Sequence, residues 1–146
     1  MKLRLAYCVI GVCLVGCTPS QPSTKSSGST GKGAAHSHEH AAPATLPEAL
    51  KQLSAHAETI GKAFLADTPN DAHDSLHDVG YVLESFPVLA KDLSDEKKAA
   101  IKKSADELFE CFGALDETMH GGIETPYSKV GERIKTALSG LKSAIE

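Results

Sequence analysis

Three histidines and a glutamate fall within five consecutive residues, His36, Ser37, His38, Glu39 and His40. Imidazole is a ligand that suits zinc, copper and nickel ions, and short histidine-rich tracts are a compositional sign of metal binding. The surrounding segment is polar and must lose conformational entropy when it binds an ion. The sequence therefore predicts a weak, open metal site at His36, His38 and His40. The alternative is a solvated linker whose histidines have no role.

A second group of possible metal ligands is divided between two segments with helical spacing. Its members are His73, Asp74, His77 and Asp78 in the first segment and Asp116, Glu117 and His120 in the second. His73 and His77 are four residues apart, so on a helix they share one face and are spaced to share one ion.

The two segments meet if their helices form an antiparallel hairpin that turns near residue 93. His73 then lies level with Asp116, and each follows a core position by one residue, on the flank of the seam between the helices. We therefore expect a surface site for zinc, copper or nickel from His73, His77 and Asp116, with His120 or Glu117 assisting. His120 lies a turn or more beyond His77, so all four are not expected on one ion. The alternative is an ion pair between His73 and Asp116 without a metal.

The elements that must position these residues are helices. Apolar residues recur at steps of four and three, the spacing of a helix face that packs into a bundle. The four blocks run from Leu46 to Phe64, from Ala72 to Ala90, from Ile101 to Met119 and from Tyr127 to Ile145. Short connections make neighbours antiparallel, which predicts an all-α, up-down-up-down four-helix bundle over residues 45–146. A three-helix bundle with a loose C-terminal helix is the alternative.

Local signals predict where these helices begin and end. Thr45 followed by Glu48 is the arrangement of a capping box, and Ser94 is a second expected N-cap. Gly121 and Gly122 are expected to stop the third helix, as glycine does past a helix C-terminus.

Two prolines carry further expectations. Thr125 followed by Pro126 predicts an N-cap and a first helical residue for the last helix. Pro87 lies inside the second block and removes one backbone hydrogen bond, so a kink or an early end is expected there.

Cofactors known from helical bundles are not expected in the core. Asp74-Ser75-Leu76-His77 and Glu117-Thr118-Met119-His120 have the carboxylate-x-x-His spacing of di-iron bundles, but their histidines follow core positions instead of occupying them. No haem is expected, because a Cys-x-x-Cys-His sequence is absent. Phe86, Phe109 and Met119 are not interpreted as a cofactor pocket.

The first residues have the plan of a secretory signal. Met1 to Arg4 is basic, and an uncharged apolar stretch from Leu5 to Val15 follows, shorter than the about 20 residues that span a bilayer. Leu14-Val15-Gly16-Cys17 then resembles the lipobox of bacterial lipoproteins. The resemblance implies a signal peptide over residues 1–16 and a lipidated Cys17, whose acyl chains, such as palmitate, anchor the protein to a membrane. An ordinary secretory signal with an incidental Cys17 is the alternative.

Cleavage changes the cysteine count and the charge. Cys8 and Cys13 leave with the signal and Cys17 is lipidated, so Cys111 remains as a possible thiol and is expected to be a small, semi-buried packing residue and not a nucleophile. Loss of Lys2 and Arg4 leaves 13 of 15 basic residues against 19 acidic ones, a net charge of -6, which argues against nucleic acid as a partner.

Residues 17–44 are expected to be a polar tether, because they are rich in Ser, Gly, Pro and Ala and lack large apolar residues. The sequence shows no nucleophile elbow, no phosphate-binding glycine loop and no His-Glu-x-x-His, so we do not expect an enzyme. The prediction is an exported lipoprotein, in the periplasm or at the cell surface, that binds or buffers a transition metal or carries it to an envelope transporter. The alternative is an interaction or structural module of the cell envelope in which the histidines have no role.

Overall fold

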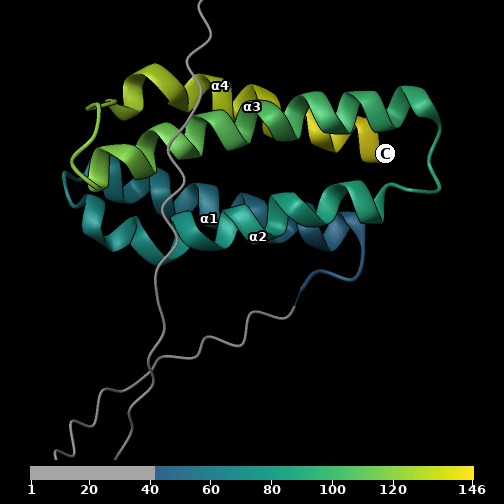
Figure 1. Cartoon of the computed structure of the whole chain (residues 1–146), viewed down its shortest axis with the longest axis horizontal. Helices are drawn as coiled ribbons and strands as arrows, with labels where there is room; N and C mark the ends of the chain where they lie inside the picture. Colours follow the sequence, from purple (N-terminus) through teal and green to yellow (C-terminus); the bar gives the residue numbers. More distant parts are fainter. Residues whose placement is uncertain (1–41) are drawn as a thin grey trace, which may run out of the picture. The chain divides into compact units, whose positions relative to one another are not determined.

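The structure is a computed structural model that describes residues 42–146. This part folds into four long helices, α1 (Leu46–Leu65), α2 (His73–Leu89), α3 (Asp95–Met119) and α4 (Tyr127–Ile145), with a short 3-10 helix, η1 (Pro69–Ala72), between the first two. The four helices lie along one common direction and alternate in sense (Figure 1). The described residues contain no strand, so the predicted all-α four-helix bundle is confirmed.

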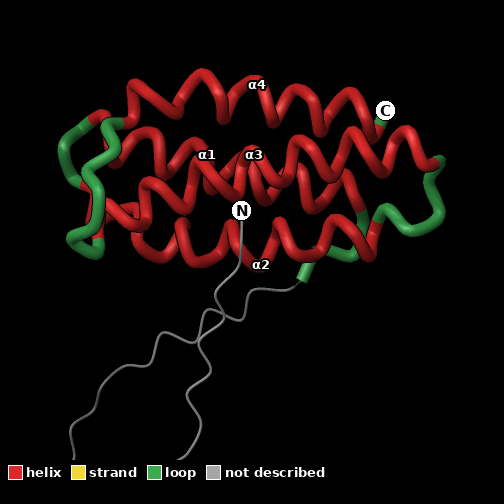
Figure 2. The backbone as a smooth tube through the Cα atoms, turned by 45° about the horizontal axis from the view of Figure 1, so that its top comes forward, coloured by secondary structure: helices red, strands yellow, loops and turns green. Residues whose placement is uncertain are grey.

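Each helix packs against two others, in a closed ring. α1 contacts α2, α2 contacts α3, α3 contacts α4, and α4 contacts α1 (Figure 2). The alternative of a loose C-terminal helix is therefore wrong, because α4 closes the bundle against both α1 and α3.

The core comes from the apolar stripes of all four helices. The largest fully buried side chains include Leu53 and Ile60 of α1, Phe86 of α2, Leu108 and Leu115 of α3, and Ile134 and Leu141 of α4. All belong to the four-and-three spacing of the sequence. Phe109 follows a stripe residue directly and is 57% exposed, because one further residue turns the side chain by about 100° around a helix.

The helix starts follow local capping chemistry. Thr45 Oγ1 accepts a hydrogen bond from the Glu48 amide at 3.3 Å, and Ser94 Oγ accepts one from the Lys97 amide at 3.4 Å, so both predicted N-caps are confirmed. The Glu48 carboxylate reaches one residue further back than in a capping box and accepts from the Ala44 amide at 2.9 Å.

Two expectations about proline need correction. α4 begins at Tyr127 with Pro126 as its N-cap, so Thr125 does not cap it. The Thr125 amide instead donates to Thr118 Oγ1 at 2.8 Å, which ties the start of α4 to the end of α3.

α2 continues past Pro87 to Leu89, so an early end at Pro87 is wrong. A proline this near a C-terminus costs only one backbone hydrogen bond in the last turn.

Candidate metal site at one end of the bundle

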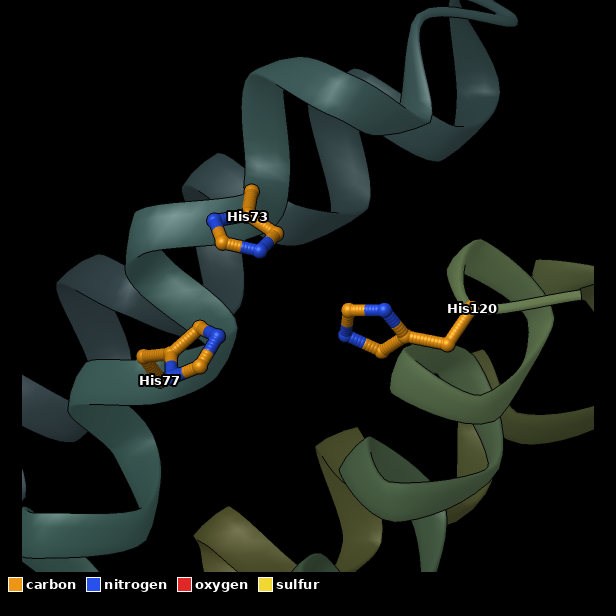
Figure 3. A group of neighbouring side chains, drawn as sticks. All are labelled: His73, His77 and His120. Atoms are coloured by element: carbon orange, nitrogen blue, oxygen red, sulfur yellow. The ribbon is translucent and has the colours of Figure 1, made fainter.

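Three histidines meet where α2 begins and α3 ends. His73 is the first residue of α2, His77 follows one turn later, and His120 is the C-cap of α3. η1 fixes the start of α2, because its last residue, Ala72, is fully buried and holds His73 at the edge of the core. Figure 3 shows His120 pointing across the α2–α3 seam toward His73 and His77.

The three rings can supply one nitrogen each to a common ion. One ring nitrogen of each histidine lies within 4.8 Å of those of the other two. The ring centroids of His73 and His77 are 4.6 Å apart, and those of His73 and His120 are 5.8 Å apart. Ligand atoms on tetrahedral zinc, with bonds of about 2.0–2.1 Å, are roughly 3.3 Å from each other. Small side-chain rotations would therefore bring the three nitrogens onto one ion, which we name the three-histidine site.

The chain turns directly after His120. Gly121 has φ +78°, and the Gly122 amide donates to the Glu117 carbonyl at 2.9 Å, as in a Schellman motif. His120 itself has left helical geometry, with φ -91° and ψ 13°. One of its ring nitrogens lies within 4.8 Å of those of His73 and His77, so the expectation that it lies too far from His77 is wrong.

Glu117 lies against the turn after α3 and is not part of the group of converging donors. A Cβ atom on Gly122 would lie 3.0 Å from the Glu117 carboxyl carbon, so this carboxylate lies against the turn. Its predicted assistance to the metal site is not supported by this placement.

The carboxylates near the site contact single histidines. Asp116 Oδ1 lies 3.4 Å from His120 Nε2, and Asp74 Oδ1 lies 3.6 Å from His73 Nδ1. The expected pair between His73 and Asp116 is therefore replaced, because His120 reaches back one turn to Asp116. A carboxylate on one nitrogen of a ligating imidazole orients the ring and raises its basicity. The structure assigns Asp116 a contact with His120 instead of a place among the three donors.

Helix electrostatics act on the two halves of the site in opposite directions. His120 lies at the C-terminus of α3, where the helix dipole favours a cation, whereas His73 lies at the N-terminus of α2, where it disfavours one. Asp74 and Asp116 add negative charge on both sides. The side chains of His73 and His120 are 47% and 56% exposed, so an ion here remains open to solvent.

Asp78, adjacent to His77 in the sequence, belongs to another environment. It is the one buried charged residue that the described range shows, and its Oδ2 lies 3.9 Å from His56 Nδ1 of α1. Sequence reasoning missed this pair, although Asp78 directly precedes Val79, a core position of the stripe.

Cys111 is a packing residue of α3, as expected, but it is fully buried instead of semi-buried. Burial raises the pKa of its thiol, and the carboxylates of Glu107 and Glu110 act in the same direction against the opposing charge of Arg133. A thiol with a raised pKa is a poor nucleophile and a poor metal ligand.

The other predicted site residues, Cys17, His36, His38 and His40, lie outside the described residues, as do the signal peptide and most of the tether. Within residues 42–146, none of the helices is long and apolar enough to cross a membrane. Comparisons of the chain with protein-family models, with curated proteins and with solved structures gave no match.

Proposed function

We propose that this protein is a non-catalytic, exported lipoprotein that binds a divalent transition metal ion at the bundle end. The observation that carries the proposal is the convergence of His73, His77 and His120, from two helices, within 4.8 Å. The lipobox-like Leu14-Val15-Gly16-Cys17 supports export and a lipid anchor on the membrane. In this role the protein buffers zinc, copper or nickel in the periplasm or at the cell surface, or carries the metal to an envelope transporter.

The donor set supports ions of this class. Imidazole nitrogen suits zinc, copper and nickel, whereas magnesium and calcium prefer oxygen ligands. Cys111 lies buried in the core, so the site lacks the thiolate that would favour monovalent copper. Beyond the three histidines of this site, His56 lies beside Asp78 of the core, and the tract His36, His38 and His40 is a second, weaker site in this proposal.

Calorimetric titration of the full-length protein with zinc, copper and nickel at neutral pH tests the bundle site. Replacing His73, His77 and His120 with glutamine should abolish the tighter binding event. The matched control replaces the other histidine triplet, His36, His38 and His40, with serine and should retain it. Equal binding by both variants and the natural sequence would show that the three-histidine site does not hold the metal.

The lipid anchor is tested separately by Cys17→Ser. Labelling of cells with radioactive palmitate should mark the natural protein and leave the variant unlabelled, and the variant should move from the membrane fraction to the soluble one. Unchanged membrane association of Cys17→Ser would contradict the proposed anchor.

A groove between α2 and α3 supports a second candidate function, an interaction module of the cell envelope. The groove is about 400 Å³ in volume and is largely apolar, with Leu83, Phe86, Ile101, Ala105 and Phe109 among its lining residues. Exposed apolar surface of this kind marks interaction sites in many proteins. A photo-crosslinking amino acid at position 105 should yield a discrete adduct in cells, and Phe109→Ser should remove it. Absence of any adduct would count against this function.

A further inference from the structure

We propose that the ion at the three-histidine site keeps one coordination position open, and that this position takes an imidazole from outside the site. This external imidazole would exchange with water while His73, His77 and His120 remain bound to the ion. The inference rests on the proposed metal-binding function and adds what completes the coordination of the ion.

The open position follows from the number of donors. Zinc takes four ligands in most protein sites, and three protein ligands leave the fourth position to water or another molecule. In the described part of the chain, His73, His77 and His120 form the one group whose donor atoms converge. Asp116 contacts His120, Asp74 contacts His73, and Glu117 lies against Gly122. The fourth position is therefore left unfilled by the side chains as they lie.

The open position faces solvent. The side chains of His73 and His120 are about half exposed, and His77 is also exposed. The site lies at the end of the bundle, between the start of one helix and the turn after another (Figure 3). A ligand from outside can therefore approach the ion without opening the core.

Charge favours a neutral nitrogen donor over an anion at this position. The carboxylates of Asp74 and Asp116 already face the imidazoles of the site, so a second anion would meet their repulsion. Imidazole is neutral, and it belongs to the donor class that zinc, copper and nickel share. Such an imidazole is present in the chain's own tract, His36, His38 and His40, and in histidines of other molecules.

A closed site is the rival arrangement. Asp116 Oδ1 is 3.4 Å from His120 Nε2, close to the roughly 3.3 Å between two ligands of tetrahedral zinc. If the side chain of Asp116 rotates toward the ion, it becomes the fourth ligand and excludes imidazole. An open site therefore predicts that added imidazole binds the ion whether or not Asp116 is present. A closed site predicts that Asp116 blocks the binding of imidazole.

The test uses full-length protein loaded with one equivalent of Cu²⁺, in the variant whose His36, His38 and His40 are replaced by serine. Addition of imidazole should produce a saturable change at one imidazole per copper, with an additional nitrogen coupling in the electron paramagnetic resonance spectrum. Asp116→Asn should leave this response in place, because Asp116 is not the fourth ligand. The matched control Glu117→Gln should behave like the parent variant.

The natural sequence distinguishes the two sources of imidazole. If its own tract supplies the ligand, the four-nitrogen spectrum is present without added imidazole and does not depend on protein concentration. If another molecule supplies it, the same spectrum develops only as protein concentration rises or imidazole is added. Either result supports an open position.

Other results would overturn the inference. A copper spectrum that does not change on addition of imidazole in the tract variant, but does change in the same variant carrying Asp116→Asn, would establish a closed site of three histidines and an aspartate. The proposed function would survive that result. Absence of copper binding in the tract variant would overturn both the three-histidine site and this inference.

Discussion

Two regions of this bundle, the side of α4 and the seam between α2 and α3, differ in how closely their helical glycines are packed. On the side of α4, Gly61 of α1 and Gly131 of α4 both face Tyr127, and added Cβ atoms would lie 2.6 Å from its hydroxyl oxygen and 2.8 Å from its ring, respectively. In the α2–α3 seam, Gly80 and Gly113 have no atom within 4 Å of where a Cβ would be. The first pair of glycines permits close packing, whereas the second pair lines open space.

The two seams of α3 also differ in chemistry. Toward α4, Arg133 bridges Glu107 and Glu110 with distances of 2.6 and 2.9 Å. Toward α2, an apolar groove runs beside exposed Phe109, and the three-histidine site lies at its end. The seam toward α4 is thus joined by ion pairs, whereas the seam toward α2 is apolar and ends at possible metal ligands. The following predictions test this contrast, beginning with the largest effect.

Metal should stabilise the bundle by joining the two helices of the open seam. At free zinc one hundred times the dissociation constant, the free energy of unfolding should rise by about 2.7 kcal/mol, because the ion binds the folded state. Urea unfolding with and without zinc measures the gain. It should vanish in His77→Gln and persist when His36, His38 and His40 are serine. An equal gain in His77→Gln would place the ion elsewhere.

Gly61→Val should destabilise the side of α4. Its side chain would overlap the hydroxyl and ring of Tyr127, which also lies against Gly131 and stacks on Phe64 with a centroid distance of 6.4 Å. Overpacking of this kind costs about 1–3 kcal/mol, measured as a loss in the free energy of unfolding. Removal of the ring in the double variant Gly61→Val, Tyr127→Leu should recover part of the loss. If the double variant recovers none of the lost free energy of unfolding, the valine does not clash with the Tyr127 side chain.

Gly113→Ala should act in the opposite direction. Alanine at this exposed helical position meets no neighbour and restricts the unfolded chain, so the free energy of unfolding should rise by about 0.5–1 kcal/mol. The same denaturation experiment measures it, with Gly80→Ala as a second variant in the same seam. A loss of stability in both variants would show that the seam is more tightly packed than its geometry indicates.

The smallest expected effect is a loss of stability in alkali. Burial raises the pKa values of Cys111 and Tyr127 in the folded protein. Groups with raised pKa values favour folding below their unfolded values, about 8.5 for cysteine and 10 for tyrosine, and this contribution is lost as the pH rises past them. The free energy of unfolding should therefore fall between pH 8 and pH 10, and less steeply in Cys111→Ala. An identical slope in the variant would exclude the thiol as a cause.

Much of the bundle was predictable because its determinants are local. The four-and-three apolar spacing placed all four helices, and Thr45, Ser94 and Gly121 marked their ends, since capping involves only neighbours along the chain. The spacing of His73 and His77 likewise predicted two imidazoles on one face, which the structure brings together.

Only the tertiary structure decided which residues meet across helices. Axial level in an ideal hairpin paired His73 with Asp116, but in the structure His120 points across the seam and contacts Asp116 itself. The burial of Asp78 beside His56 depends on how α1 lies against α2. Sequence periodicity states which face of a helix is apolar. The direction of side chains at helix ends and between helices depends on capping turns and packing, which no single stretch of sequence specifies.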